Sequence, residues 1–289
     1  MKEKRKTKPA RKSAATALMC APIIIWSALF IITPMAILVF ISFMSKGTLG
    51  KIDFHFTLSN YAGIFKPVYY SVVAESVRIA LWTTVITVLM GYPFAFHMAA
   101  IRRKTSGLIL IFLMLPLWVS GIVILYSYVI LLGSHGIINT TLLNLGLIKE
   151  PLELLYNDFA VIVGMVYMFL PLAILPMYSA AEKLDRRLLE ASSDLGAGPV
   201  QTFFRITFPN TAPGIFAAVI LTFIPCIGYY MVTDMLGGGT TMMAGNLIYR
   251  QFTIARNWPF GAAVSVVLGA IILLMVWIYT KVGGSLDDL

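Results

Sequence analysis

Charged residues are scarce in this chain, and the motifs of the common enzyme classes are missing. Asp, Glu, Lys and Arg make up 12% of the 289 residues and hydrophobic residues 59%, whereas soluble domains carry roughly 25% charged residues. No G-x-x-x-x-G-K-[ST] phosphate loop is present, and the three histidines (His55, His97 and His135) form no metal-ligand motif. We therefore expect no enzyme activity, no catalytic residue, no metal and no resident cofactor, so that any ATP would be bound by a partner.

Cysteine is equally scarce. Cys20 and Cys226 both fall inside apolar runs, one expected near the inner face of a membrane and the other towards the outer half. This separation argues against a disulfide between them. We interpret both as small, buried hydrophobic residues.

Long apolar runs without charge are abundant. Six of them are about long enough to cross a hydrocarbon core of ~30 Å as helices. They must be helices rather than open strands, because lipid offers no partner to unpaired backbone groups. A chain of 289 residues cannot bury six such helices in a soluble core. The sequence therefore predicts an all-α integral membrane fold with six transmembrane helices at 17–44, 79–96 (beginning near residue 72), 108–132, 159–181, 212–233 and 260–280.

The distribution of Lys and Arg predicts the orientation. Fifteen of the 22 cationic residues fall on the side of the N-terminus and six on the other, with Arg78 inside the second run. The positive-inside rule then places both termini in the cytoplasm. We expect a basic cytoplasmic tail (1–16), a six-helix domain (17–281) and a short cytoplasmic tail (282–289). The net charge of +9 is explained by this topology and by anionic membrane lipid, without a nucleic-acid partner.

Residues 190–209, EASSDLGAGPVQTFFRITFP, form the most informative motif. They follow the pattern E-A-x-x-x-x-G, nine further residues, I-x-x-P, at Glu190, Ala191, Gly196, Ile206 and Pro209. This register resembles the EAA loop of permease subunits in ATP-binding-cassette (ABC) importers. Ser192 and Phe208 stand where that loop usually has Ala and Leu. The resemblance implies that the loop 184–209, between the fourth and fifth helices, grips an ATPase.

The same loop has the local signals of two short helices. Asp185 suits an N-cap for a helix over 186–195, and Gly196 suits its C-terminal stop. Gly198 and Pro199 suit the start of a second helix that carries aromatic residues. The resemblance implies coupling to the ATPase through Glu190, Ala191, Gly196, Phe203, Phe204, Ile206 and Pro209. For Glu190, an ordinary exposed helix charge remains the alternative.

The C-terminal segment DMLGGGTTMMAGNLIYRQFTIARNWPFGAAVS, with TPMAILVFISF in the first run, resembles the first permease of spermidine/putrescine importers. The resemblance implies a multi-pass protein of the bacterial inner membrane, paired with a second six-helix permease, a homodimeric ATPase and an extracytoplasmic substrate-binding protein. Importers of sulfate, ferric iron, thiamine and phosphonates share this body and remain alternatives for the substrate. A stand-alone integral membrane protein is a further alternative.

A polycationic substrate needs carboxylates and aromatic faces along its path. Asp234 is the leading candidate, because Tyr230 lies one helical turn before it, beyond the helix-kinking Pro225. An N-cap role, or pairing with Arg250, is the alternative for Asp234. For the prolines inside the apolar runs two interpretations stay open. Their kinks open a cavity along the path, or they serve helix packing alone. Further candidates for the substrate path are Tyr229, Trp118, Tyr126 and Glu75.

Overall fold

The computed structural model describes residues 20–281, so the two tails predicted at 1–16 and 282–289 lie outside the described part. Within it, six helical segments are long and apolar enough to cross a membrane, which confirms the all-α, six-span prediction. The spans are Cys20–Ser42, Pro67–Ala100, Gly121–Asn144, Asp158–Glu182, Pro199–Gly228 and Trp258–Ile278.

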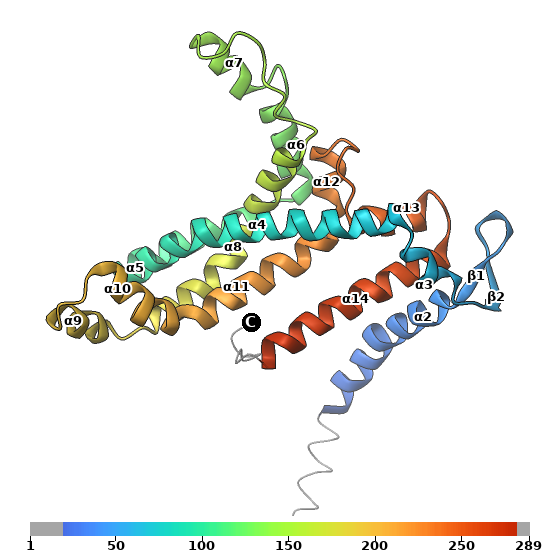
Figure 1. Cartoon of the computed structure of the whole chain (residues 1–289), viewed down its shortest axis with the longest axis horizontal. Helices are drawn as coiled ribbons and strands as arrows, with labels where there is room; N and C mark the ends of the chain where they lie inside the picture. Colours follow the sequence, from blue (N-terminus) through green and yellow to red (C-terminus); the bar gives the residue numbers. More distant parts are fainter. Residues whose placement is uncertain (1–19, 282–289) are drawn as a thin grey trace, which may run out of the picture.

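The centre of the molecule is a bundle of three long helices, α4 (Pro67–Ala100), α8 (Asp158–Glu182) and α11 (Phe208–Gly228) (Figure 1). These helices contact one another along their lengths. α4 and α8 continue through their internal prolines, Pro93, Pro171 and Pro176. The largest buried cluster lies around α8 and includes Ile79, Leu125, Met165, Phe169, Cys226 and Leu236.

The first and last spans flank this bundle. The first ends with a π-helical turn, η1 (Ala28–Ile32), and α2 (Thr33–Ser42), which contacts α14 (Trp258–Lys281). Most of the first span faces away from the rest of the chain. For that reason Cys20 is exposed, against the expectation that it is buried, whereas Cys226 is buried as expected.

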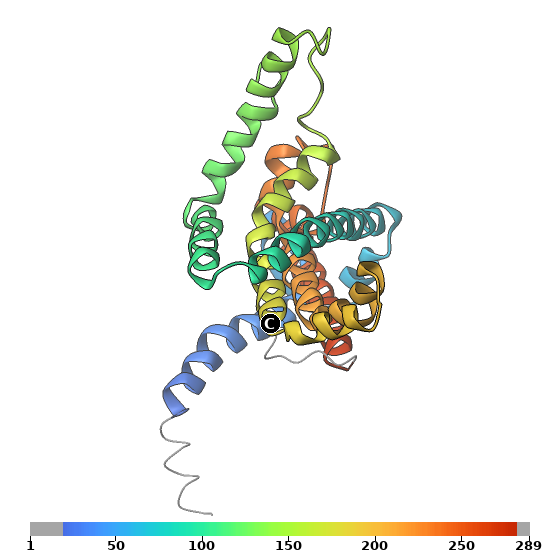
Figure 2. The same cartoon turned by 90° about the vertical axis from the view of Figure 1, so that its left-hand side faces the viewer.

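The third predicted span is wrong in its bounds, because the run 108–132 is interrupted at Pro116. α5 (Arg103–Met114) gives way to a 3-10 turn, η3 (Leu115–Trp118), before α6 (Gly121–Leu132) begins. Proline cannot donate the helical hydrogen bond and clashes with the preceding turn. The span continues into α7 (Ile137–Asn144), and α6 with α7 leans away from the bundle (Figure 2).

The fifth predicted span, 212–233, is also broken. α11 ends at Gly228, and α12 (Tyr230–Leu236) starts a new helix directly after Tyr229. Pro225 removes one backbone donor in the last turn of α11, and glycine is a poor helix former, so the helix stops there. At its other end the span is longer than predicted, because α10 (Pro199–Thr202) and the π-helical η4 (Phe203–Thr207) run directly into α11.

Small elements occupy the two ends of the bundle (Figure 1). At one end lie α9 (Arg186–Asp194) and α10. At the opposite end lie an unpredicted antiparallel hairpin of β1 (Met44–Lys46) and β2 (Ile52–Phe56), joined by η2 (Thr48–Gly50), then α3 (Ser59–Ile64) and α13 (Ala244–Thr253). The loop 184–209 and the hairpin therefore project from opposite ends of the bundle.

Candidate functional site

The loop between α8 and α11 folds into two short helices, as its local signals predict. The Asp185 carboxylate accepts a hydrogen bond from the backbone N–H of Arg187 at 3.0 Å and caps α9. Gly196 has a φ of +80° and ends the helix, a conformation that favours glycine. Gly198 then precedes Pro199, the first residue of α10. Only the end of the first helix differs, at Asp194 instead of Leu195.

Ser192 fastens the two short helices together. Its side chain is buried, and its hydroxyl lies 2.9 Å from the hydroxyl of Thr202 in α10. Its backbone carbonyl accepts a hydrogen bond from the N–H of Ala197 at 3.0 Å. The Ser192 hydroxyl therefore supplies an interhelical hydrogen bond that alanine could not make. From the sequence, this position was only a mild departure from the usual motif.

The predicted coupling residues differ in exposure. Glu190, Ala191, Gly196 and Pro209 are exposed and Ile206 is half-buried. Phe204 is 64% exposed and projects as expected. Phe203 does not project freely, because its ring packs edge-on against Tyr92 of α4, with centroids 6.0 Å apart. The apolar end of this surface includes Leu195, which is 88% exposed.

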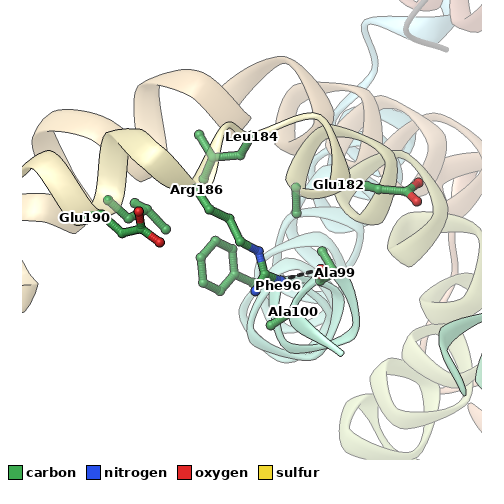
Figure 3. Close-up of a pocket in the computed structure, with 9 residues that line it drawn as sticks. Phe96, Ala99, Ala100, Glu182, Leu184, Arg186 and Glu190 are labelled. Atoms are coloured by element: carbon green, nitrogen blue, oxygen red, sulfur yellow. Dashed lines mark hydrogen bonds between the residues drawn. The ribbon is translucent and has the colours of Figure 1, made fainter. Parts of the chain in front are cut away.

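A cavity of about 260 Å³ lies between α9 and the C-terminal end of α4 (Figure 3). Glu190 and Arg186 reach it from α9, and Phe96, Ala99 and Ala100 reach it from α4. The Arg186 guanidinium crosses it and donates a hydrogen bond to the Ala99 carbonyl at 2.8 Å. No sequence pattern predicts this contact, which joins residues 87 positions apart.

Glu75 belongs to an ion-pair cluster that the sequence did not predict. Arg78 of α4 forms salt bridges with both Glu75 and Asp158. The second Asp158 oxygen accepts a hydrogen bond from the Thr241 hydroxyl at 2.6 Å. Glu75 therefore already has a cationic partner in this structure. The cluster connects α4, the start of α8 and the segment after α12.

Asp234 lies in the middle of α12 and is exposed. It is not an N-cap, since Tyr229 occupies that position, and within residues 20–281 it forms no ion pair with Arg250. Tyr230 lies one turn before it, as predicted, and stacks on Tyr249 of α13 with ring centroids 4.5 Å apart. One face of the Tyr230 ring is therefore covered by a tyrosine that the sequence did not single out.

A buried amide holds this region in place. The Asn246 side chain accepts hydrogen bonds from the Thr233 hydroxyl at 2.5 Å and the Met243 N–H at 3.2 Å. It donates a hydrogen bond to the Tyr230 carbonyl at 3.2 Å. Because α12 has only seven residues, these bonds to α13 fix its position. The bond from Asn246 also occupies the backbone carbonyl of Tyr230, which lies just after the break between α11 and α12.

The remaining aromatic candidates are dispersed. Tyr229 sits at the break after α11 and packs edge-on against Phe169, with centroids 5.7 Å apart. Trp118, on η3, is 88% exposed, and Tyr126, on α6, is 59% exposed. The structure thus brings Tyr230 and Asp234 onto one short helix beside Tyr229, while Glu75 lies in the separate cluster with Arg78.

Residues 83–286 match the family described as binding-protein-dependent transport system inner membrane component. The chain belongs to this family. It is a permease component of an ABC importer and a multi-pass inner-membrane protein, so the alternative of a stand-alone membrane protein is wrong.

The chain is also similar to individual proteins, among them two relatives and one solved structure. It is 40% identical over 262 residues to the spermidine/putrescine transport system permease protein PotB of Haemophilus influenzae, covering 91% of this chain and 92% of the relative. It is 38% identical over 269 residues to PotB of Escherichia coli K12, and the aligned region covers 93% of this chain and 98% of the relative. A bacterial ABC transporter involved in alginate import shares the fold, with a TM-score of 0.76 over 94% of this chain and 96% of that chain at 16% identity.

Proposed function

We propose that this permease carries polyamines such as spermidine and putrescine into the cell. The observation that carries the proposal is the 38–40% identity to spermidine/putrescine permeases along more than 90% of this chain. Sulfate, thiamine, iron and phosphonate remain the competing substrates. They are less favoured, because the similarity to the polyamine permeases extends over nearly the whole of both chains.

The proposed complex contains this chain, a second homologous permease, a homodimeric ABC ATPase and an extracytoplasmic binding protein. The loop 184–209 is the proposed ATPase contact. Its two helices are tied to each other through Ser192 and project from one end of the bundle. Glu190 and Phe204 are exposed on this projection, where a partner subunit can reach them. Closure of the ATPase would then move the loop and, with it, α4, α8 and α11.

On the substrate side, the proposed contact residues are Asp234 and Tyr230. Asp234 carries a carboxylate without a cationic partner among the described residues. Tyr230 is half-buried, and Tyr249 covers one face of its ring, so a cation would have to meet the other face. A carboxylate beside an aromatic face suits an alkylammonium group, which gains both charge pairing and a cation–π contact. The other predicted path residues, Tyr229, Trp118 and Tyr126, would add aromatic surface.

Uptake into proteoliposomes that contain the complete complex tests the substrate. Radiolabelled putrescine and spermidine are supplied with the binding protein outside and ATP inside. Competition by unlabelled polyamine, and none by thiamine or sulfate, is the expected result. Uptake of thiamine or sulfate without polyamine uptake would overturn the polyamine assignment. Vesicles without ATP serve as the control.

A further inference from the structure

We propose that Arg186 is a positioning residue that transmits movement of the coupling helix α9 to the transmembrane helix α4. The inference rests on the proposed contact between α9 and the ATPase. It assigns Arg186 a role separate from that of Glu190, which lies one turn further along α9. Both side chains line the cavity beside α4, but of the two only Arg186 forms a hydrogen bond with α4.

The contact that carries the proposal is the hydrogen bond from the Arg186 guanidinium to the Ala99 carbonyl, 2.8 Å long (Figure 3). Ala99 is in the last turn of α4, where the carbonyls have no partner within the helix. The C-terminal end of a helix also carries partial negative charge, which a guanidinium complements. The bond is therefore charge-assisted and of the stronger kind.

The sparse packing around this bond makes it important for passing movement from α9 to α4. Between α9 and the end of α4 there is a cavity of about 260 Å³ instead of close side-chain packing. Within residues 20–281, this is also the only side-chain hydrogen bond between the two helices. A push or pull on α9 can therefore reach the end of α4 directly through Arg186, beside the indirect route through α10 and Phe203.

α4 is well placed to carry such a displacement across the membrane. Its 34 residues correspond to about 51 Å of helix at 1.5 Å per residue. It packs along both α8 and α11. In its outer half, Arg78 ties it to Asp158 at the start of α8. Helix α4 thus joins the Arg186 contact at one end to the ion-pair cluster near the other.

The adjacent Arg187 provides a matched control. It has the same charge and the same exposed class as Arg186, but its side chain makes no hydrogen bond or ion pair with the described residues. Arg187→Gln and Arg186→Gln therefore remove equal charge from the same turn of α9. Only Arg186→Gln removes a contact with α4. Arg186→Lys keeps a cationic donor that can still reach one carbonyl.

The experiment measures polyamine uptake and ATP hydrolysis in the same proteoliposomes, with the complete complex. We expect Arg186→Gln to keep the ATPase subunit bound and to keep hydrolysing ATP, while polyamine imported per ATP falls about tenfold or more, the order expected for losing a charge-assisted hydrogen bond. Arg186→Lys should restore part of this ratio, and Arg187→Gln should leave it unchanged.

Three results would overturn the proposal. An unchanged uptake-to-ATP ratio in Arg186→Gln would show that the bond does not transmit movement, and an equal loss in Arg187→Gln would show that only the charge of α9 matters. Loss of the ATPase subunit from Arg186→Gln would place Arg186 in the docking surface instead. Failure of the wild-type complex to retain an ATPase would instead refute the proposed contact of α9.

Discussion

Single side chains in the coupling loop divide between two tasks. Ser192 and Arg186 point inward and hold the loop to itself and to α4, through bonds of 2.9 Å and 2.8 Å. Glu190 and Phe204 are exposed and make no side-chain hydrogen bond with the described residues. A substitution in the first group should alter how movement is transmitted. A substitution in the second should alter whether the partner binds at all.

Glu190→Lys should release the ATPase or uncouple it, while the permease still inserts into the membrane. The side chain is exposed on α9, outside the membrane spans, so its charge reversal costs the fold little. Co-purification of the ATPase with a tagged permease measures the effect. Glu150→Lys, a reversal at an exposed position between α7 and α8, is the control and should keep the ATPase. Normal co-purification and normal transport by Glu190→Lys would refute its docking role.

Asp234→Asn should cut polyamine uptake sharply and leave complex assembly intact. The substitution keeps the shape of the side chain and removes the charge that the ammonium group would meet. Uptake and subunit stoichiometry are measured on the same preparation. Glu153→Gln removes a charge from another exposed position, and it should transport normally. Full uptake by Asp234→Asn would remove Asp234 from the substrate path and favour a non-cationic substrate.

The helices show where local sequence signals suffice and where they fail. Asp185, Gly196 and Pro199 act within one or two turns of their own positions, and each does what the sequence predicts. The runs that contain Pro116 and Pro225 were each predicted as one helix, and both are broken. Proline inside α8 leaves that helix continuous, so the residue alone does not decide between a kink and a break.

Gly196→Val should weaken the coupling loop, because valine is strained at the φ of +80° found there. The cost is on the order of 1 kcal/mol or more. Open space surrounds the position, so backbone strain rather than steric overlap would be the cause. Gly198→Ala is the matched control: its φ is −71° and its surroundings are equally open. We expect Gly196→Val to reduce transport and Gly198→Ala to leave it unchanged. Equal transport by both variants would contradict the assignment.

The candidate site depends more on long-range contacts than the helices do. Asp234 and Tyr230 could be paired from their spacing alone, since i and i+4 share a helix face. Tyr249, Asn246 and Thr241 could not be found this way. Each meets a partner at least 13 positions away, and no periodic pattern marks such a contact. The same holds for Arg186 and Ala99.

The molecule consists of a three-helix centre and three outlying spans. The first span and α6 expose many apolar side chains, including Trp26, Phe30, Ile122 and Ile130. In a membrane, lipid tails can cover these faces at no hydrophobic cost, and in the proposed complex a second permease would cover part of them. The α9 end and the hairpin end stay at opposite extremes of the bundle (Figure 1).

The whole-molecule prediction is the topology. Reporters fused after Lys104 or near Leu195 should report the cytoplasm, and reporters near Lys149 or Gly239 should report the exterior. The physical reason is the excess of Lys and Arg on the cytoplasmic side. Alkaline phosphatase and green fluorescent protein fusions measure the two sides in complementary ways. An exterior signal at Leu195 would refute the coupling role of the loop, because an ATPase in the cytoplasm could not reach it.

The ion pair on α4 also bears on how the chain enters the bilayer. An unpaired arginine costs roughly 2.5–3.5 kcal/mol at the centre of an inserting helix and less towards its ends, where Arg78 lies. Arg78 has Glu75 one turn before it on the same helix, so the two charges can neutralise each other while α4 is being released from the translocon. Asp158 is synthesised 80 residues later. It then joins a pair that already exists, and the order of synthesis leaves no stage at which Arg78 must cross the lipid unpaired.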